Sequence, residues 1–439
     1  MKIKDGYMIQ EIARQIALRG ARAFYAGGFV RDQLLNVSDH DSKDIDIEVF
    51  LLEPGVLRDI LSNFGEVKEV GKSYPVFKIS GYPHFDFTVA PPGSSYEKAA
   101  LRRDFTVNAM MIDVISGDLI DPCQGVKDLH LRTIRHTQPR VFIDDPLRVY
   151  RAVQLAARLN FSISPETQKL MAETALTNID PERILLEIAK MLLRAEHPSI
   201  GLRYLEQTGV LERNHPELYC LKACIQSPTH HPEGDVWEHT LLVVDQAARL
   251  RKKSRDPQTL MWAALLHDIG KPGVTRQEGE KVTAYGHDTQ GAELARRFLR
   301  NLRASRSLTD RVTVLVREHM RPVLLYKERE KLSDKAIRKL VERVNVAELL
   351  LLSEADYCGR TLKRDYAPIR TWLLERIARL GLDPESGINP LVQGRDLLAL
   401  GFEPGPALGD VLKEAYEMQL EGKSKEEILK DLKKPLEQT

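Results

Sequence analysis

The sequence predicts an α+β chain in which a small mixed α/β segment is followed by a long all-α remainder. Runs rich in β-branched and aromatic residues, typical of strands, fall early in the chain at residues 45–50, 76–79, 85–89 and 109–114. From about Pro146 onward such runs almost vanish, and apolar residues recur at helical spacing, as in residues 149–159. Strands gathered in one part of a chain and helices in the other are typical of this fold class.

Four domains are expected from the length of the chain and from the Pro-rich segments that mark its boundaries. Its 439 residues exceed what one hydrophobic core usually accommodates. A stretch rich in Pro and His at residues 227–232 marks a boundary, and another follows Pro368. We predict a head over residues 1–138, a helical neck over 139–224, a third helical domain over 225–365 and a helical tail over 366–439.

The composition limits the partners and the location of the protein. Lys and Arg number 64 against 63 Asp and Glu, so no global field favours a polyanion. The local run 295–306 is basic, and it is either an RNA contact or the solvated face of a helix. The four cysteines are scattered, and no signal core or membrane-length apolar stretch occurs, so we expect a cytoplasmic protein without a membrane partner. The sequence predicts no particular oligomeric state.

Two aspartates stand one residue apart at the first predicted strand, after a glycine-rich turn. Side chains at i and i+2 of a strand share a face, so the carboxylates of Asp44 and Asp46 project together and can hold a divalent ion. The turn at Gly27 and Gly28 opens a predicted helix over residues 30–35, where bare backbone N–H groups suit phosphates. An isolated pair of this kind also occurs on ordinary polar strand faces. Whether it is a metal site or such a face depends on the other residues of the same segment.

Further residues in the same segment point to phosphoryl transfer. Asp86 is a charge between two aromatic residues on another predicted strand, and with the first two carboxylates it would complete a site for two Mg²⁺ ions. Downstream, the guanidinium groups of Arg102 and Arg103 suit the charge of a triphosphate, and Asn108 suits a sugar hydroxyl. Together these residues predict metal-assisted chemistry on a nucleoside triphosphate.

Asp145 and Arg148 lie three residues apart around Pro146, at a predicted helix start, and therefore on nearly one face. One interpretation is a plain N-terminal acid in an intrahelical ion pair. The other is base recognition, because an arginine only donates hydrogen bonds and an ionised aspartate only accepts them. Such a pair fits the Watson–Crick edges of cytosine and adenine and opposes those of uracil and guanine.

The motifs of residues 8–220 resemble, in this order, those of bacterial tRNA nucleotidyltransferases and the related poly(A) polymerases. The residues that carry the resemblance are Gly27, Gly28, Val30, Arg31, Asp32, Asp44, Asp46, Arg102, Arg103, Asp104, Phe105, Asn108, Ala109, Gly125, Asp128, Leu129, Ile134, Arg135, Asp144, Asp145, Arg148, Pro181, Glu182 and Arg183. The resemblance implies a polymerase beta-like nucleotidyltransferase head and an RNA-binding helical neck. It implies Asp44, Asp46 and Asp86 as the catalytic carboxylates, the first two of them as metal ligands.

The same resemblance implies a nucleotide site. Its members are Gly27, Gly28, Arg31, Arg102, Arg103, Asp104, Asn108, Asp145 and Arg148. In this family a protein template, which the Asp145/Arg148 pair resembles, selects CTP and ATP. Glu182 and Arg183 resemble a helix-start motif that braces the template, and their alternative is a plain helix N-terminus. Only residues 89–101 separate the third carboxylate strand from the paired arginines, and this short segment resembles the CC-adding subgroup, which does not switch to ATP.

A second constellation of metal-binding residue types recurs at helical intervals within residues 225–365. It resembles an HD-type metal phosphohydrolase domain, which accompanies the nucleotidyltransferase head in some bacterial relatives. The resemblance implies metal ligands at His239, His267, Asp268 and Asp356, and second-tier candidates for phosphate contact or a second metal at Lys271, His287 and His319. It implies Mn²⁺, Ni²⁺ or Fe²⁺ as the metal, and 2′,3′-cyclic phosphates or phosphate-blocked RNA ends as substrates.

The leading hypothesis is a tRNA 3′-terminal nucleotidyltransferase with tRNA, CTP and ATP as partners and with a second, phosphohydrolase site. Two alternatives stay open at this point. A poly(A) polymerase shares nearly every head motif, and a phosphohydrolase could use the head only to dock RNA. The complete set of three head carboxylates speaks against the second alternative, because a docking domain has no need of metal ligands.

Overall fold

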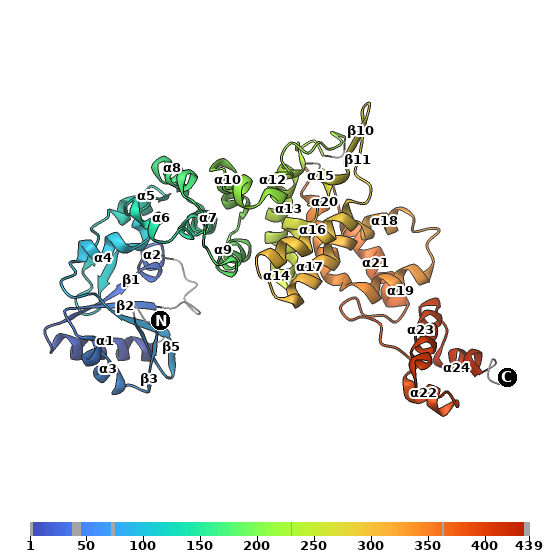
Figure 1. The fold of residues 1–439 in the computed structure, drawn as a ribbon, viewed down its shortest axis with the longest axis horizontal. Helices are drawn as coiled ribbons and strands as arrows, with labels where there is room; N and C mark the ends of the chain where they lie inside the picture. Colours follow the sequence, from blue (N-terminus) through green and yellow to red (C-terminus); the bar gives the residue numbers. More distant parts are fainter. Residues whose placement is uncertain (1–2, 37–44, 72–74, 230, 362–363, 434–439) are drawn as a thin grey trace. The chain divides into compact units, whose positions relative to one another are not determined.

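The structure, a computed structural model, describes residues 3–36, 45–71, 75–229, 231–361 and 364–433 (Figure 1). The chain forms two compact units, one of Met1–Met191 with Ile200–Asn214 and the other of Leu192–Ser199 with His215–Thr439. Asp44, one of the predicted metal ligands, lies outside the described residues. The division into four domains stays a prediction.

A seven-stranded sheet, counted over the described residues, forms the base of the first unit in the order β3-β4-β5-β2-β1-β6-β7. The strands are β1 (Arg22–Ala26), β2 (Ile45–Phe50), β3 (Val67–Val70), β4 (Val76–Ile79), β5 (Tyr82–Val89), β6 (Met111–Asp113) and β7 (Leu119–Ile120). β2 and β5 run parallel, whereas the other neighbouring strands are antiparallel. The predicted strands at 45–50 and 76–79 coincide with β2 and β4, and those at 85–89 and 109–114 overlap β5 and β6.

The alternation of side chains along β2 separates the core from the candidate site. Ile45, Ile47 and Val49 point to one face, where they pack in a core with helices α1 (Ile3–Ala17) and α3 (Pro54–Ser62). Phe50 belongs to a smaller core on the opposite face, together with Ala99 of α4 (Tyr96–Arg102). Asp46 and Glu48 alternate with the first set, so they lie on this second face.

Short helices complete the first unit after the glycine-rich turn and after the sheet. They are α2 (Gly28–Leu34), η1 (Thr106–Asn108), α5 (Gly125–His130), α6 (Arg140–Asp144), α7 (Arg148–Leu159), α8 (Pro165–Glu173), α9 (Pro181–Arg194), α10 (Ser199–Gln207) and α11 (Val210–Asn214). Strands β8 (Thr133–Ile134) and β9 (Ser162–Ile163) pair in parallel beside α7. The last residues of α9 belong to the second unit, so this helix connects the two.

The second unit is almost entirely helical. Its helices are α12 (Pro216–Tyr219), α13 (Val236–Leu250), η2 (Arg251–Lys253), α14 (Pro257–Leu266), α15 (Lys271–Val274), α16 (His287–Asn301), α17 (Arg306–Glu318), α18 (Arg321–Lys327), α19 (Asp334–Arg343), α20 (Val346–Cys358), α21 (Ala367–Arg379), α22 (Gly394–Ala399), α23 (Pro406–Glu421) and α24 (Lys425–Lys433). A hairpin of β10 (Arg276–Glu278) and β11 (Lys281–Thr283) interrupts them. Across the described residues, no helix is both long and apolar enough to cross a lipid bilayer.

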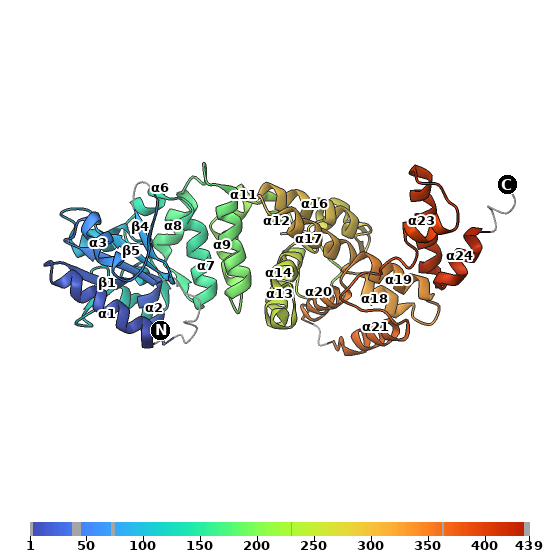
Figure 2. The same ribbon diagram turned by 90° about the horizontal axis from the view of Figure 1, so that it is seen from below.

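Helix α14 forms the centre of this unit. Its residues 259–266 are all buried, so the helix is enclosed around its whole circumference. Helices α13, α17 and α20 pack against it, and Figures 1 and 2 show α13, α14 and α20 side by side. The chain that leaves α14 therefore starts inside the unit, where His267 is 0% and Asp268 is 2% exposed.

The tail has a small core of its own formed by α22, α23 and α24, with Leu397, Ala415 and Ile428 at its centre. The Oγ atom of Ser424 accepts a hydrogen bond from the Glu427 backbone, and the Glu427 carboxylate accepts one from the Ser424 backbone. This reciprocal pair is a capping box, which opens α24.

The buried His215 makes the stability of the second unit depend on pH. Burial lowers its pKa to about 4, and the ring lies 5.7 Å from that of Phe298. The unfolded chain takes up a proton at this histidine near pH 6.5, whereas the folded chain does so only near pH 4. The contribution of neutral His215 to the free energy of unfolding is therefore complete above pH 6.5, and it is lost as the pH falls toward 4.

We expect His215→Gln to remove about 3 kcal/mol of acid destabilisation between pH 7 and pH 4. Urea unfolding of the two proteins across this range gives the difference directly, because all other titrating groups are shared. Parallel stability curves would contradict the assignment of a depressed pKa to His215.

Candidate active sites

Asp46 and Asp86 face each other across two adjacent strands. β2 and β5 run parallel with Asp46 directly opposite Asp86 in the register. Adjacent strands lie about 4.8 Å apart, so one metal ion can reach both carboxylates. The Asp46 side chain is 47% exposed and that of Asp86 is 21% exposed, so ligands can approach this part of the sheet. Carboxylate oxygens are the ligands that Mg²⁺ prefers, and the two residues fit such an ion.

Lys78, on the neighbouring strand, forms an ion pair with Asp86. The Nζ atom of Lys78, on β4, lies 2.5 Å from Oδ1 of Asp86. The strand pairing of β4 with β5 brings the two side chains together. Sequence reasoning did not identify Lys78, although its alternation with the buried Phe77 and Ile79 places it on the polar face.

Gly27 lies against the carboxylate of Asp46. Its φ angle is +69°, and a Cβ atom on this residue would lie 2.9 Å from Oδ2 of Asp46 and 3.2 Å from a terminal nitrogen of Arg103. No side chain fits between the turn and the two charged groups. The predicted glycine turn is thus in direct proximity to the predicted metal ligand.

Gly27→Ala is expected to impair nucleotide addition, whereas Gly20→Ala is expected to affect stability alone. Both glycines have positive φ angles, +69° and +77°, so both substitutions strain the backbone by roughly 1–3 kcal/mol. Only at Gly27 does the added Cβ meet the site, since a Cβ on Gly20 meets nothing within 4 Å. CMP incorporation at equal folded concentration separates the two effects, and equal losses in both variants would contradict the proximity argument.

Arg103 forms ion pairs with both acidic side chains on the polar face of β2. Its terminal nitrogens lie 3.7 Å from Oδ2 of Asp46 and 2.8 Å from Oε2 of Glu48. Burial opposes the charge on Arg103, but the two carboxylates raise its pKa. Arg102 lies 3.4 Å from Glu48 and is 40% exposed. Glu48, which sequence reasoning left unassigned, is at the i+2 position from Asp46 and shares its face.

Three of the predicted nucleotide-binding residues lie in a buried network below this site. Arg31 donates hydrogen bonds to Asp32 and, at 2.5 Å, to Oδ1 of Asn108, and Asn108 donates to Oδ1 of Asp104 at 2.9 Å. Arg31, Asp104 and Asn108 are 3%, 5% and 6% exposed. In the described structure these side chains bond to one another, so they support the site, and direct contact with a nucleotide stays a prediction for them.

Arg151, on α7, links this network to the other charged groups and was missed by sequence reasoning. Its Nη2 atom lies 2.8 Å from Oδ2 of Asp104. Burial acts to raise the pKa of Asp104, but Arg151 and the Asn108 hydrogen bond outweigh it and lower that pKa. In turn Asp104 raises the pKa of Arg151, and Asp145 and Asp46 add to the effect. The signal in the sequence is its spacing of three residues from Arg148, which puts both on one helix face.

Asp145 and Arg148 do not lie on one helix as predicted, and their side chains bond to different partners. Asp145 follows α6 with an extended backbone, at φ −148° and ψ 96°, and α7 begins only at Arg148. Pro146 restricts the preceding residue to this extended region, which explains the difference. Arg183 donates a hydrogen bond to Oδ2 of Asp145 at 2.9 Å. Arg148 donates to the carbonyl oxygens of Val141 and Arg102, at 3.2 and 3.1 Å.

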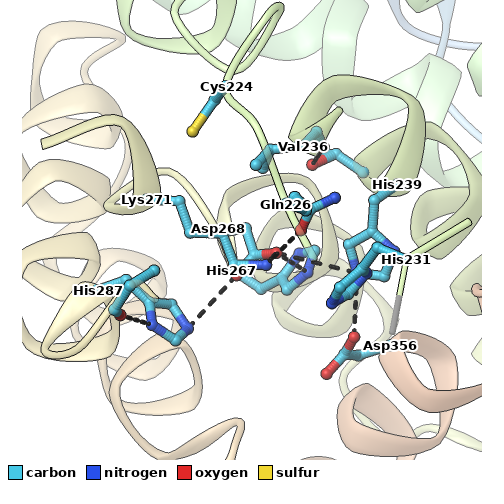
Figure 3. Close-up of polar contacts among 12 residues, drawn as sticks. Cys224, Gln226, His231, Val236, His239, His267, Asp268, Lys271, His287 and Asp356 are labelled. Atoms are coloured by element: carbon cyan, nitrogen blue, oxygen red, sulfur yellow. Dashed lines mark hydrogen bonds and ion pairs between the residues drawn. The ribbon is translucent and has the colours of Figure 1, made fainter. Parts of the chain in front are cut away.

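In the second unit, the predicted HD residues form one buried cluster (Figure 3). The side chains come from α13, the ends of α14 and α17, the start of α16, and α20. Among the described residues, three triads have ligand atoms close enough to hold a metal ion, and two of them consist only of predicted residues: His239 with His267 and Asp356, and Asp268 with His287 and His319. The structure thus brings together all the ligands predicted for this domain, including both histidines assigned to the second tier.

Asp268 lies between the two triads and turns one carboxylate oxygen toward each. Its Oδ2 lies 3.2 Å from Nε2 of His267 and 3.8 Å from Nε2 of His239. Its Oδ1 lies 3.5 Å from Nε2 of His287 and 3.9 Å from Nε2 of His319. Burial opposes ionisation of Asp268, but the neighbouring His267 and Lys271 hold its pKa well below the usual range. Its two oxygens could therefore serve as ligands for a metal held by either triad.

The backbone fixes the orientation of three of the imidazoles. Nδ1 of His267, His287 and His319 lies 2.7 to 2.9 Å from a carbonyl oxygen three residues earlier. A carbonyl only accepts hydrogen bonds, so each Nδ1 carries a proton, and Nε2 is the atom through which each imidazole can bind a metal. These three Nε2 atoms are buried without a hydrogen-bond partner. Buried lone pairs that converge on carboxylates fit divalent transition metals.

Glu233 orients His239, and sequence reasoning gave it no role. Its Oε1 atom lies 2.9 Å from Nδ1 of both His239 and His231. Burial opposes ionisation, but the hydrogen bond from His239 lowers the pKa of Glu233 to about 2. Burial also lowers the pKa of His231 to about 3 and that of His319 to about 4. The remaining Nε2 of His239 points to Oδ1 of Asp356, 3.0 Å away.

A cavity of about 360 Å³ opens beside the cluster. Asp268, His287 and Asp356 reach its surface, and the cationic side chains of Lys271 and Arg360 line it as well. Nζ of Lys271 lies 2.6 Å from Oδ2 of Asp268 and donates a hydrogen bond to Gln226 at 2.7 Å. A cluster of candidate metal ligands beside a lysine that lines a cavity suits the hydrolysis of a phosphoester.

Three segments of the chain match known families. Residues 82–135 match the poly A polymerase head domain, residues 160–221 the probable RNA and SrmB-binding site of polymerase A, and residues 236–361 the HD domain. A multifunctional CCA protein of Xanthomonas campestris pv. campestris (strain B100) is 32% identical over 90% of this chain and 97% of its own length. One of Actinobacillus pleuropneumoniae serotype 5b (strain L20) is 36% identical over 67% of this chain and 74% of its own.

Solved structures with the same fold have been determined with nucleotide and with tRNA. The CCA-adding enzyme of Bacillus stearothermophilus in complex with CTP has a TM-score of 0.67 at 22% identity, and the match covers 100% of both chains. The Thermotoga maritima CCA-adding enzyme complexed with tRNA has a TM-score of 0.60 at 21% identity, over 99% of this chain and 95% of that one. These likenesses confirm the predicted α+β fold class with its nucleotidyltransferase head.

Proposed function

We infer the function from a premise that the relatives establish: the chain belongs to the family of multifunctional CCA proteins. We propose that it transfers CMP from CTP, and then AMP from ATP, to the 3′ end of tRNA. The observation that carries the proposal is the Asp46/Asp86 pair across β2 and β5, in a chain whose curated relatives bear this name. A protein that only binds RNA would have no need of these two carboxylates as metal ligands.

In the proposed reaction the terminal 3′ oxygen of tRNA attacks the α-phosphorus of the nucleotide. The bond between the α-phosphorus and the bridging oxygen breaks, and pyrophosphate leaves. Asp46 and Asp86, with Asp44, would hold Mg²⁺, which when bound neutralises triphosphate charge and favours the ionised hydroxyl. Arg102 and Arg103 stand beside these carboxylates and would bind the triphosphate.

We assign base selection to Asp145 and Arg148. The acceptor and donor groups of the pair suit cytosine and adenine, whose Watson–Crick edges invert those of uracil and guanine. The hydrogen bond from Arg183 to Asp145 supports a bracing role for Arg183. Glu182 precedes it at the start of α9 and belongs to the same helix turn.

The test offers the protein three tRNAs, ending before CCA, after the first C and after CC, each with CTP or ATP. We expect CTP to extend the first two and ATP to extend the third. Processive A-tailing of an unstructured RNA primer would support a poly(A) polymerase, and no addition to any tRNA would overturn the proposal. The short connection from Val89 to α4 favours a second candidate, a CC-adding enzyme, for which tRNA ending in CC accepts no AMP.

For the second unit we propose a phosphohydrolase activity on 2′,3′-cyclic phosphates or phosphate-blocked RNA ends. Water attacks the phosphorus, and a P–O ester bond breaks. His239, His267, Asp268 and Asp356, with His287 and His319, would hold Mn²⁺, Ni²⁺ or Fe²⁺, which when bound supplies a water of lowered pKa. Lys271 would bind the phosphate. The substrates proposed for both sites are RNA ends and nucleotides. We therefore propose that the protein works in the cytoplasm.

A further inference from the structure

The cavity beside the histidine–aspartate cluster has a polar floor and an apolar mouth. Asp268, Asp356 and Arg360 belong to the floor, where each is largely buried. Ile225 and Tyr285 line the same cavity but are 46% and 82% exposed. A ligand that fills this space therefore meets charges at one end and apolar surface at the other.

Arg360 lies on the floor of the cavity and has a hydrogen-bond donor without an acceptor. Its side chain is 13% exposed, and its Nη2 atom lies 3.5 Å from Oδ1 of Asp356, one helical turn earlier. Its Nε atom is buried without a hydrogen-bond partner. A guanidinium group has five N–H donors, and the buried one on Nε has no acceptor here. An anion in the cavity, above all a phosphate with several acceptor oxygens, would match them.

Tyr285 is exposed at the mouth of the cavity, on a backbone segment that is anchored to the cluster. It directly follows the hairpin of β10 and β11, and His287 begins α16 two residues later. Nδ1 of His287 lies 2.7 Å from the carbonyl oxygen of Ala284, which ties the backbone at the tyrosine to the cluster. An aromatic ring in such a place can stack on a planar nucleobase, whichever base it is.

We propose that Arg360 and Tyr285 are substrate-binding residues of the phosphohydrolase site. Arg360 pairs with the scissile phosphate, and Tyr285 stacks on the base of the nucleotide that carries it. The substrate class is a nucleoside phosphate, either free or at the end of an RNA strand. The assignment rests on the phosphohydrolase function proposed above. Sugar phosphates and phosphorylated side chains contain no base for the tyrosine, so they bind through the phosphate alone.

The test measures binding by calorimetry to the full chain without added metal. The head is the same in every variant, so differences between variants report binding in the second unit. The probes are inorganic phosphate, adenosine 3′-monophosphate and a tetranucleotide with a 3′-phosphate. Tyr285→Ala should weaken binding of both nucleotide probes about tenfold or more and leave phosphate binding unchanged. Tyr285→Phe, the matched control, keeps the ring and should bind all three probes as the wild type does. Tighter binding of the tetranucleotide than of the mononucleotide identifies the RNA end as the source.

Arg360→Gln should weaken binding of all three probes about tenfold or more, and Arg360→Lys, which keeps the charge, should recover part of the loss. Thermal unfolding of each variant confirms that the fold is intact. Unchanged affinities in Tyr285→Ala and Arg360→Gln would overturn the assignment even if the wild type hydrolyses phosphoesters. The expected binding pattern in a chain that hydrolyses none of them would support the two binding residues and overturn the phosphohydrolase function.

Discussion

Asp46→Asn is expected to lower the rate of CMP transfer to tRNA lacking its CCA end by about 1,000-fold or more. Asparagine keeps the size of the side chain but removes the negative charge opposite Asp86. It also removes a carboxylate partner of Arg103, whose pKa this group helps to raise. Initial rates with labelled CTP and saturating tRNA measure the effect.

Two controls accompany this experiment. Asp59→Asn changes an exposed aspartate on α3, and it should leave CMP transfer unchanged. Hydrolysis of a chromogenic phosphodiester by the second unit should also persist in Asp46→Asn. A variant that retains CMP transfer within tenfold of the wild type would show that Asp46 is not a required ligand.

Asp268→Asn is expected to abolish hydrolysis by the second unit and its retention of transition metal. The residue is 2% exposed and presents its two oxygens to two different sets of histidines. Loss of the negative charge should therefore weaken both metal positions at once and reduce hydrolysis by about 1,000-fold or more. Elemental analysis after Mn²⁺ loading and gel filtration measures the bound metal, and a chromogenic phosphodiester reports the rate.

The matched control is Asp410→Asn, which alters a tail aspartate that is 78% exposed and should change neither readout. CMP transfer should persist in Asp268→Asn, because the head carboxylates are untouched. Loss of both activities in a folded Asp268→Asn protein would contradict the assignment of two separate sites. Unchanged metal content would contradict the assignment of Asp268 as a metal ligand.

The strands with strong local signals could be predicted, and those without them could not. Residues 45–50 and 76–79 combine β-branched or aromatic residues with clear alternation, and both predictions match strands. β1 was not predicted, although it is central in the sheet, because its five residues include two alanines, which favour helix as readily as strand. The hairpin of β10 and β11 is made mostly of exposed polar residues, so hydrophobic periodicity gives no signal there.

In the candidate sites, too, some residues could be predicted from the sequence and others could not. The resemblance of this segment to an HD domain implies His239, His267, Asp268, Asp356, His287 and His319, and the structure brings these six residues together. The resemblance does not reveal Glu233, which acts through the imidazole of His239. In the head, Arg31 and Asn108 look like ligand-binding residues, but they bond to each other across 77 positions of sequence.

By itself, the sequence determined the division into a mixed α/β part and a helical part, the residue types of both sites and the family to which the chain belongs. These depend on local periodicity and on the chemistry of individual side chains. Only the tertiary structure decided that Asp268 faces two triads, that Asp145 is extended and bonded to Arg183, and that Arg360 lines a cavity. Such pairings join residues distant in the chain, and they are set by the packing of whole elements, which no local pattern contains.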